Sequence, residues 1–177
     1  MRILLFLSIL LYSCANDPAA VKEFIETGNS PIERINEAEI LHTENGLLKV
    51  KVIANTIERF KDIQPRLVFS NGIEVIFYND SGAVTSSLKA LNAGIDEINN
   101  IMTASESVIL TSSEGKRLET EELIWNENKK KIYTNKRVVI TTNKEVIEGE
   151  GFESNPDFSQ YSISKIQGTF DFKTPAD

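Results

Sequence analysis

The sequence has 177 residues, and its 26 acidic side chains against 19 basic ones give a formal net charge of −7. Such an acidic chain lacks the basic stripe that neutralises a phosphate backbone, which argues against nucleic acid as a partner. With one histidine and one cysteine, it has no pair of these residues at zinc-binding spacing, and it has no HExxH motif, phosphate-binding glycine loop or nucleophile elbow. The composition therefore argues against an enzyme and predicts no metal ion and no other cofactor.

The chain begins with the pattern of a lipoprotein signal peptide over residues 1–13. One positive charge at Arg2 precedes an apolar run from Ile3 to Leu11, and Ser13 stands directly before Cys14, the only cysteine. The run is much shorter than the ~20 residues that span a membrane. We therefore expect cleavage before Cys14 and a lipid anchor on that residue. The alternative is an ordinary secretory signal followed by a cysteine without a disulfide partner.

The next segment, residues 14–31, has the composition of a flexible tether. It contains Pro18 and Gly28 and no strand pattern, which is typical of an unstructured connection. Pro31 marks its end, so the folded domain is expected over residues 32–177.

From Glu37 onward nearly every segment has the β-branched and alternating pattern of strands. Asn-Gly is the strongest short hairpin signal, so Asn71-Gly72 predicts a hairpin between residues 66–70 and 73–78. Short strands at regular spacing, with no long helical pattern, indicate one all-β domain. The expected strands are residues 37–42, 47–55, 66–70, 73–78, 84–91, 98–104, 108–112, 118–125, 131–135, 138–142, 145–154 and 161–172.

Part of this strand pattern repeats along the chain. Residues 138–141 (VVIT) are similar to residues 108–111 (VILT) and 75–78 (VIFY), and a glycine, Gly82 or Gly115, lies seven residues after the first valine of the two earlier copies. Glycine permits the positive φ of a tight turn. Each unit is therefore expected to be a strand, a turn and a return strand, and several units must stack to bury their apolar faces.

The alternating phase of these strands predicts one inward-facing row of apolar side chains. On the residues alone, this row is interpreted as a hydrophobic core. Its members are Val50, Val52, Ile73, Val75, Phe77, Val84, Leu88, Met102, Val108, Leu110, Val138 and Ile140.

Residues 119–143 (ETEELIWNENKKKIYTNKRVVITTN), followed by residues 145–155 (EVIEGEGFESN), resemble the carboxyl-terminal half of the LptC family of lipopolysaccharide-export proteins. The similarity extends over about residues 36–172. It is sharpest in the Leu-x-Trp-Asn turn, in the Tyr-Thr strand and in the Gly-x-Gly-Phe-x-Ser motif that begins at Gly149. In place of the membrane-spanning amino-terminal helix of that family, this chain has the lipoprotein signal.

The resemblance implies an LptC/OstA-like open β-jellyroll, a V-shaped antiparallel β-structure whose apolar groove holds acyl chains. The inward row would then line this lipid groove. The implied function is to receive lipopolysaccharide from an inner-membrane ABC transporter and to pass it to a periplasmic jellyroll bridge protein similar to LptA. The implied location is the periplasm, with a lipid anchor in a membrane and the inner membrane favoured.

The resemblance also places a site for a partner protein in the last strands. An open sheet leaves unpaired backbone groups on its end strands, which are templates for strand addition. Residues 161–172 are the expected outgoing edge, and residues 37–52 the opposite edge, facing the transporter. The residues assigned to the outgoing edge are Gly149, Gly151, Phe152, Tyr161, Ile163, Ile166, Gly168 and Phe170.

A second function remains open, that of a membrane-tethered adaptor which binds only proteins through the edges of its sheet. Photocrosslinking of lipopolysaccharide from Phe77 or Ile140 would support the relay, whereas an interior that never crosslinks would support the adaptor.

Overall fold

The computed structural model describes residues 30–61 and 63–167. The chain separates into two units, residues 1–30 and 31–177, and all described strands belong to the second. Within the described residues this unit is all-β, as predicted. No helix in the described part is long and apolar enough to span a membrane. The strands are β1 (Glu33–Glu44), β2 (Leu47–Arg59), β3 (Leu67–Tyr78), β4 (Val84–Ala90), β5 (Asn92–Asp96), β6 (Ile101–Ser112), β7 (Arg117–Asn126), β8 (Lys131–Thr141), β9 (Val146–Ser154) and β10 (Tyr161–Gln167).

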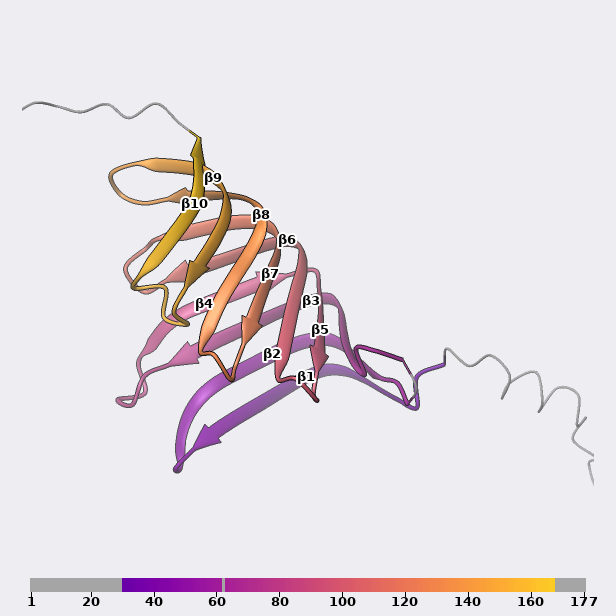
Figure 1. Ribbon diagram of the computed structural model, residues 1–177. Helices are drawn as coiled ribbons and strands as arrows, with labels where there is room; N and C mark the ends of the chain where they lie inside the picture. Colours follow the sequence, from indigo (N-terminus) through magenta and orange to yellow (C-terminus); the bar gives the residue numbers. More distant parts are fainter. Residues whose placement is uncertain (1–29, 62, 168–177) are drawn as a thin grey trace, which may run out of the picture. The chain divides into compact units, whose positions relative to one another are not determined.

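All pairings between these strands are antiparallel, as expected for successive hairpins. The strands form one sheet in the order β1-β2-β3-β4-β6-β7-β8-β9-β10, and β5 pairs with both β3 and β6. Figure 1 shows the strands following one another in space from β1 to β10. In the described sheet β1 and β10 are therefore the end strands, and each has one free backbone edge.

The predicted repeat of strand, turn and strand is confirmed. Gly82 lies in the turn between β3 and β4 with φ 80°, and Gly115 lies in the turn between β6 and β7 with φ 84°. The backbone N–H of each glycine donates to the carbonyl oxygen three residues earlier, Asn79 and Ser112, at 3.0 Å. The third copy closes its turn without glycine, since the Thr142 N–H donates to the Glu145 carbonyl at 2.9 Å.

A line of irregular positions, which we call the crease, crosses the whole sheet. At these positions the regular pairing of neighbouring strands skips residues or shifts register, and six of the residues have positive φ. Such bulges bend a strand and increase its twist. The crease consists of Glu37 in β1, Asn55 in β2, Asn71 and Gly72 in β3, Leu91 between β4 and β5, Glu106 and Ser107 in β6, Glu121 in β7, Asn135 and Lys136 in β8, Gly151 in β9 and Ser164 in β10.

At Leu91 the crease divides one strand into two. β4 pairs with residues 73–78 of β3, and β5 pairs with residues 67–69 of the same strand. Between them, the Leu91 carbonyl accepts a hydrogen bond from the Gly72 N–H at 2.9 Å, and the Leu91 N–H donates to the Glu106 carbonyl at 3.0 Å. The chain therefore bends at Leu91 without leaving the sheet.

The predicted hairpin at Asn71-Gly72 is wrong, because both residues lie inside the continuous strand β3. Their φ values of 64° and 119° are those of a β-bulge, which lies opposite Asn55 in β2. The Asn55 side-chain Nδ2 donates to the Asn71 carbonyl at 2.6 Å. Two other predicted breaks are also bulges: the strands expected at 98–104 and 108–112 form one strand, β6, which begins at Ile101, and those expected at 131–135 and 138–142 form β8, which ends at Thr141. β5 was not predicted as a separate strand.

The sheet folds along the crease into two arms. The β5 arm contains residues 33–36, 56–59, 67–70, 92–96, 101–105, 122–126, 131–134, 152–154 and 161–163, and the β4 arm contains residues 38–44, 47–54, 73–78, 84–90, 108–112, 117–120, 137–141, 146–150 and 165–167. Phe77 of the β4 arm and Trp125 of the β5 arm have ring centroids 5.4 Å apart. In a flat sheet β3 and β7 would lie about 14 Å apart, three strand spacings, so this contact requires the inner faces to meet.

The core lies between the arms and receives side chains from both. Leu118, Val138 and Ile140 of the β4 arm and Ile132 of the β5 arm have no exposed surface. One core residue comes from a loop: Phe158, between β9 and β10, is also fully buried. Its ring lies 5.6 Å from that of Phe152 and 5.4 Å from that of Tyr161. These aromatic rings close the core at its β10 end.

Candidate functional site

The structure gathers the predicted inward row into one interior, with one exception. Val52 is half-buried and packs against the core, whereas Val84, at the start of β4, is 47% exposed and does not belong to the buried row. Its pairing with Tyr78 follows a register shift, which places it beyond the end of the regular ladder. The buried members are Val50, Ile73, Val75, Phe77, Leu88, Met102, Val108, Leu110, Val138 and Ile140.

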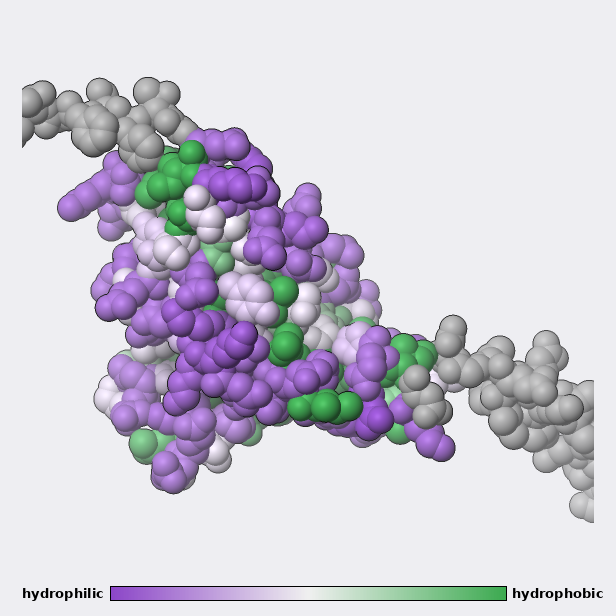
Figure 2. All heavy atoms as spheres, viewed as in Figure 1, coloured by the Kyte–Doolittle hydropathy of each residue, from purple (hydrophilic) through white to green (hydrophobic). Residues whose placement is uncertain are grey.

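The middle of this interior is densely packed and leaves almost no empty space. The space enclosed by Val75, Phe77, Leu88, Met102, Ala104, Leu123, Trp125 and Ile132 measures about 10 Å³. A cavity of about 10–15 Å³ holds at most one water molecule. On the face drawn in Figure 2, most of the visible surface is polar, and apolar side chains appear only in small groups. In this structure the row is therefore a closed core, and an acyl chain can enter it only if the arms part.

The interior opens at the β1 end. A cavity of about 110 Å³ lies there between the arms, lined by Glu33, Ile35, Ile40, Ile57, Arg59 and Leu67. Ile35 and Ile40 are 44% and 41% exposed although their strand partners, Ile57 and Val52, point inward. The sequence prediction missed this part of the apolar face, because the bulge at Glu37 changes the alternation from odd to even residue numbers.

The free ends of the two arms meet at a second opening, which we call the mouth. Contacts of the described residues that cross it are the Phe77–Trp125 ring pair, the Ser86 hydroxyl donating to the Pro156 carbonyl at 2.7 Å, and Lys116 Nζ donating to the Ser159 carbonyl at 3.3 Å. A pocket of about 340 Å³ lies at the mouth. Its lining residues are His42, Glu44, Lys49, Val50, Phe77, Tyr78, Asn79, Thr85, Trp125, Glu127, Lys130, Asn155, Pro156 and Asp157.

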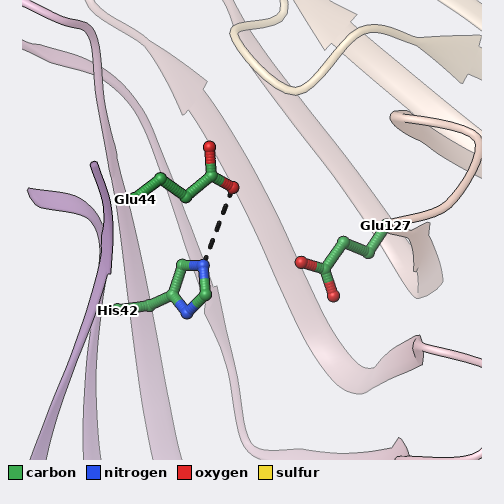
Figure 3. Close-up of side chains that lie close together, drawn as sticks. All are labelled: His42, Glu44 and Glu127. Carbon is green, nitrogen blue, oxygen red and sulfur yellow. Dashed lines mark ion pairs between the residues drawn. The ribbon is translucent and has the colours of Figure 1, made fainter. Parts of the chain in front are cut away.

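A histidine and two glutamates converge in the mouth pocket. His42 and Glu44 end β1, and Glu127 lies in the turn between β7 and β8. One nitrogen of His42 and one carboxylate oxygen of each glutamate lie within 4.8 Å of one another, and all three residues are exposed. Figure 3 shows the three side chains pointing toward a common space, from β1 on one side and the turn on the other. Sequence spacing could not reveal this group, because Glu127 is distant from His42 along the chain.

The predicted partner edge is partly described. Gly149 and Gly151 are buried where β9 meets β10, and a Cβ on Gly149 would lie 2.4 Å from Ile163 Cγ2 and 2.7 Å from the Lys165 carbonyl oxygen. Both glycines thus permit a close approach between these strands. Phe152 is buried, Tyr161 and Ile163 are half-buried, and Ile166 is exposed. Gly168, Phe170 and Cys14 lie outside the described residues.

Exposed ion pairs occur both within one strand and between neighbouring parts of the chain. Arg117 and Glu119 are 2.8 Å apart, and their hydrogen bond raises the pKa of the guanidinium and lowers the pKa of the carboxyl. Lys51 donates to Glu39, which raises the pKa of Lys51, and Lys49 lowers the pKa of Asp80. Each shift keeps its group in the ordinary charged form, as expected for structural ion pairs on a solvated face.

Comparisons with known proteins give one matching family model. A family model described as "Lipopolysaccharide-assembly, LptC-related" matches residues 2–171. A crystal structure of a protein of unknown function from Bacteroides fragilis NCTC 9343 is 17% identical, with a TM-score of 0.22, covering 81% of this chain and 96% of that one. No curated protein sequence matches.

The matched family is one of lipopolysaccharide transport and assembly, and it is not a family of enzymes. Its members are periplasmic and associated with the inner membrane. The folded antiparallel sheet is the β-jellyroll of this family. Because the family model covers nearly the whole chain, this protein belongs to the LptC-related family of lipopolysaccharide-assembly proteins.

Proposed function

We propose that this protein takes lipopolysaccharide from an inner-membrane ABC transporter at its β1 end and passes it to a jellyroll bridge protein at its β10 end. The acyl chains would lie between the two arms. The observation that carries the proposal is the apolar inner face, which continues from strand to strand and is accessible at Ile35 and Ile40 beside the 110 Å³ cavity.

The chemistry of the interior suits acyl chains. The buried row is aliphatic and aromatic, and the polar residues that are buried in the described part of the chain are the uncharged Ser86, Ser112, Asn126, Thr134 and Ser154. Each methylene that leaves water for such an environment gains about 0.8 kcal/mol. Acyl chains entering between the arms would therefore replace the apolar contacts that the arms lose to each other. The contacts that close the mouth are few, and each contributes about 1 kcal/mol.

The ends of the sheet suit protein partners. β1 and β10 each have a neighbour on one side only within the described sheet, so their other backbone edge can accept a further strand. Strand addition at both ends would extend the apolar inner face into the neighbouring jellyrolls. We assign β1 to the transporter because the interior opens there, and β10 to the bridge protein.

The amino terminus would keep the domain at the inner membrane. We propose that Cys14 carries a lipid and that residues 14–31 are its tether, because the short apolar run ends at Leu11 and this cysteine follows three residues later. A Cys14→Ala variant is then expected to move to the soluble fraction or to remain unprocessed. Membrane retention with unchanged mobility on a gel would refute the anchor.

Neighbouring residues on opposite faces of β1 provide the test of the transport function. Ile40 faces the cavity, whereas Leu41 lies on the outer face and is 56% exposed. A photocrosslinking amino acid at Ile40 should capture lipopolysaccharide in cells, and the same group at Leu41 should not. A crosslinker at the exposed Ile166 of β10 should capture the bridge protein.

The closed core favours one other candidate, the tethered adaptor that binds only proteins. If Ile40 never captures lipopolysaccharide while Ile166 captures the bridge protein, the adaptor function is correct and the relay is excluded.

A further inference from the structure

We propose that His42, Glu44 and Glu127 bind a divalent transition-metal ion of the Zn²⁺ class, which joins the β4 arm to the β5 arm across the mouth. This inference does not depend on lipopolysaccharide binding. It starts from the three side chains in Figure 3, which come from two elements that are not paired in the sheet.

The geometry is close to that of a coordination site. The three ligand atoms lie within 4.8 Å of one another, and His42 Nε2 is 3.7 Å from Glu44 Oε1. Zinc binds imidazole nitrogen and carboxylate oxygen at about 2.0–2.2 Å in a tetrahedron, which places neighbouring ligands about 3.4 Å apart. Small side-chain rotations, which are open to exposed residues, would bring the ligands to these distances.

The backbone positions of the ligands are fixed. His42 and Glu44 stand in the β1–β2 pairing opposite Val50 and Leu47. Both backbone groups of Glu127 are hydrogen-bonded. Its N–H donates to the Asn100 carbonyl and its carbonyl accepts from the Lys130 N–H, both at 3.1 Å. The convergence therefore depends on side-chain rotation alone.

The charge of the pocket favours a cation. Glu44, Glu127 and Asp157 line it together with two lysines, and one of these, Lys49, is paired with Asp80. One imidazole with two carboxylates is a mixed nitrogen and oxygen donor set, which suits Zn²⁺ and its neighbours in the first transition row. The all-oxygen preference of Mg²⁺ and Ca²⁺ disfavours those ions.

A second observation points to a ligand in the same pocket. Trp125 lines it, and within the described residues the Trp125 Nε1 is a buried side-chain nitrogen without a hydrogen-bond partner. Buried donors normally have an acceptor. The indole N–H of Trp125 is therefore a donor without an acceptor in a residue that lines this pocket.

Metal titration of the full mature chain, purified in detergent and stripped with EDTA, tests the proposal. Trp125 is the only tryptophan, so quenching of its fluorescence by Co²⁺ reports binding at this pocket, and calorimetry with Zn²⁺ gives the stoichiometry. We expect one Zn²⁺ ion to bind per chain, and we expect Mg²⁺ at the same concentration to give no heat of binding. Absence of stoichiometric Zn²⁺ or Co²⁺ binding overturns the site.

Variants decide whether the ion joins the arms. His42→Ala and Glu127→Gln should each weaken Zn²⁺ binding at least tenfold, and the increase in Tm that Zn²⁺ gives the parent protein should disappear in both. Glu145→Gln, an exposed glutamate in the β8–β9 turn, is the matched control and should bind as the parent does. Loss of binding in His42→Ala but not in Glu127→Gln would locate the ion on β1 alone and overturn the link between the arms.

Discussion

The rings of Phe77 and Trp125 meet edge to face, with centroids 5.4 Å apart and planes at 87°, although β4 and β6 separate their strands in the sheet. The contact exists because the sheet folds along the crease, which turns the ends of β3 and β7 toward each other. The ring contact therefore forms only when the arms are closed, and it is lost when they open. Any loading of the interior from the mouth must break it.

A double-mutant cycle at this pair should give a measurable coupling. Edge-to-face aromatic pairs contribute about 0.5–1.5 kcal/mol beyond their buried area. We expect Phe77→Ala and Trp125→Ala together to lower the free energy of unfolding by less than the sum of the single effects, with a difference in that range. Denaturant unfolding followed by circular dichroism measures it. The control pairs Trp125→Ala with Ile53→Ala on the outer face, where the effects should add within about 0.5 kcal/mol.

The Gly149→Ala substitution should loosen β10 from the sheet. The added Cβ would lie 2.7 Å from the Lys165 carbonyl oxygen and 2.4 Å from Ile163 Cγ2, so both backbone and side chain of β10 must move. Such overpacking costs about 1–3 kcal/mol. We expect faster hydrogen exchange of the β10 amides and weaker capture of the bridge protein.

Combining Gly149→Ala with Ile163→Ala provides the control for this prediction. The second change removes the side-chain clash and leaves the backbone clash, so the protection of the β10 amides from hydrogen exchange should recover only in part. Unchanged exchange in Gly149→Ala alone would mean that β9 and β10 do not approach as closely as the structure has them.

The fold class and the interior could be predicted from the sequence because they depend on local alternation. Val75, Val108 and Val138 repeat a pattern whose period of two fixes the buried face. The crease could not be predicted, since Asn71-Gly72 carries the same positive-φ signal in a bulge as in a hairpin. Distinguishing the two requires knowledge of the neighbouring strands, here Asn55 and Leu91.

The mouth was not predictable for a different reason. His42 and Glu127 come together only because two arms fold onto each other, and no alternation or spacing encodes that contact. Phe158 was missed because it lies in a loop, and Ile35 because it precedes Glu37, where the first strand was expected to begin.

Acid should weaken the turn between β5 and β6. Hydrogen bonds from the Asn99 side chain, the Asn99 N–H and the Ile98 N–H lower the pKa of Asp96. A carboxyl whose pKa is lower in the folded state stabilises that state above the ordinary Asp pKa of about 3.9, and the contribution is lost as the pH falls through the lowered value. In Asp96→Asn we therefore expect lower stability than in the parent at pH 7, with the difference shrinking toward pH 2. A difference that does not change with pH would contradict this role of Asp96.

A charged side chain at the β1 end should reduce lipid loading and leave the domain folded, whereas a charge in the core should unfold it. Ile140 has no exposed surface, so Ile140→Glu would bury an unpaired charge at a cost of several kcal/mol and unfold the domain, whatever its function. Ile40 is different, because it is 41% exposed and its carboxylate replacement can reach water at the cavity rim. Ile40→Glu should therefore keep the parent circular dichroism spectrum, with a loss of stability of about 1 kcal/mol.

The same Ile40→Glu variant should load much less lipopolysaccharide, because a carboxylate now stands where the apolar face is open. Contact with an acyl chain would remove water from this charge, and the charge repels phosphate groups. Leu41→Glu adds the same charge one residue away on the outer face, and it should load as the parent does. Binding of purified lipopolysaccharide to the two variants in detergent, beside the parent protein, measures the difference. Equal loading of Ile40→Glu and Leu41→Glu would show that lipid does not pass the β1 end, and the opening at Ile35 and Ile40 would then have no part in transport.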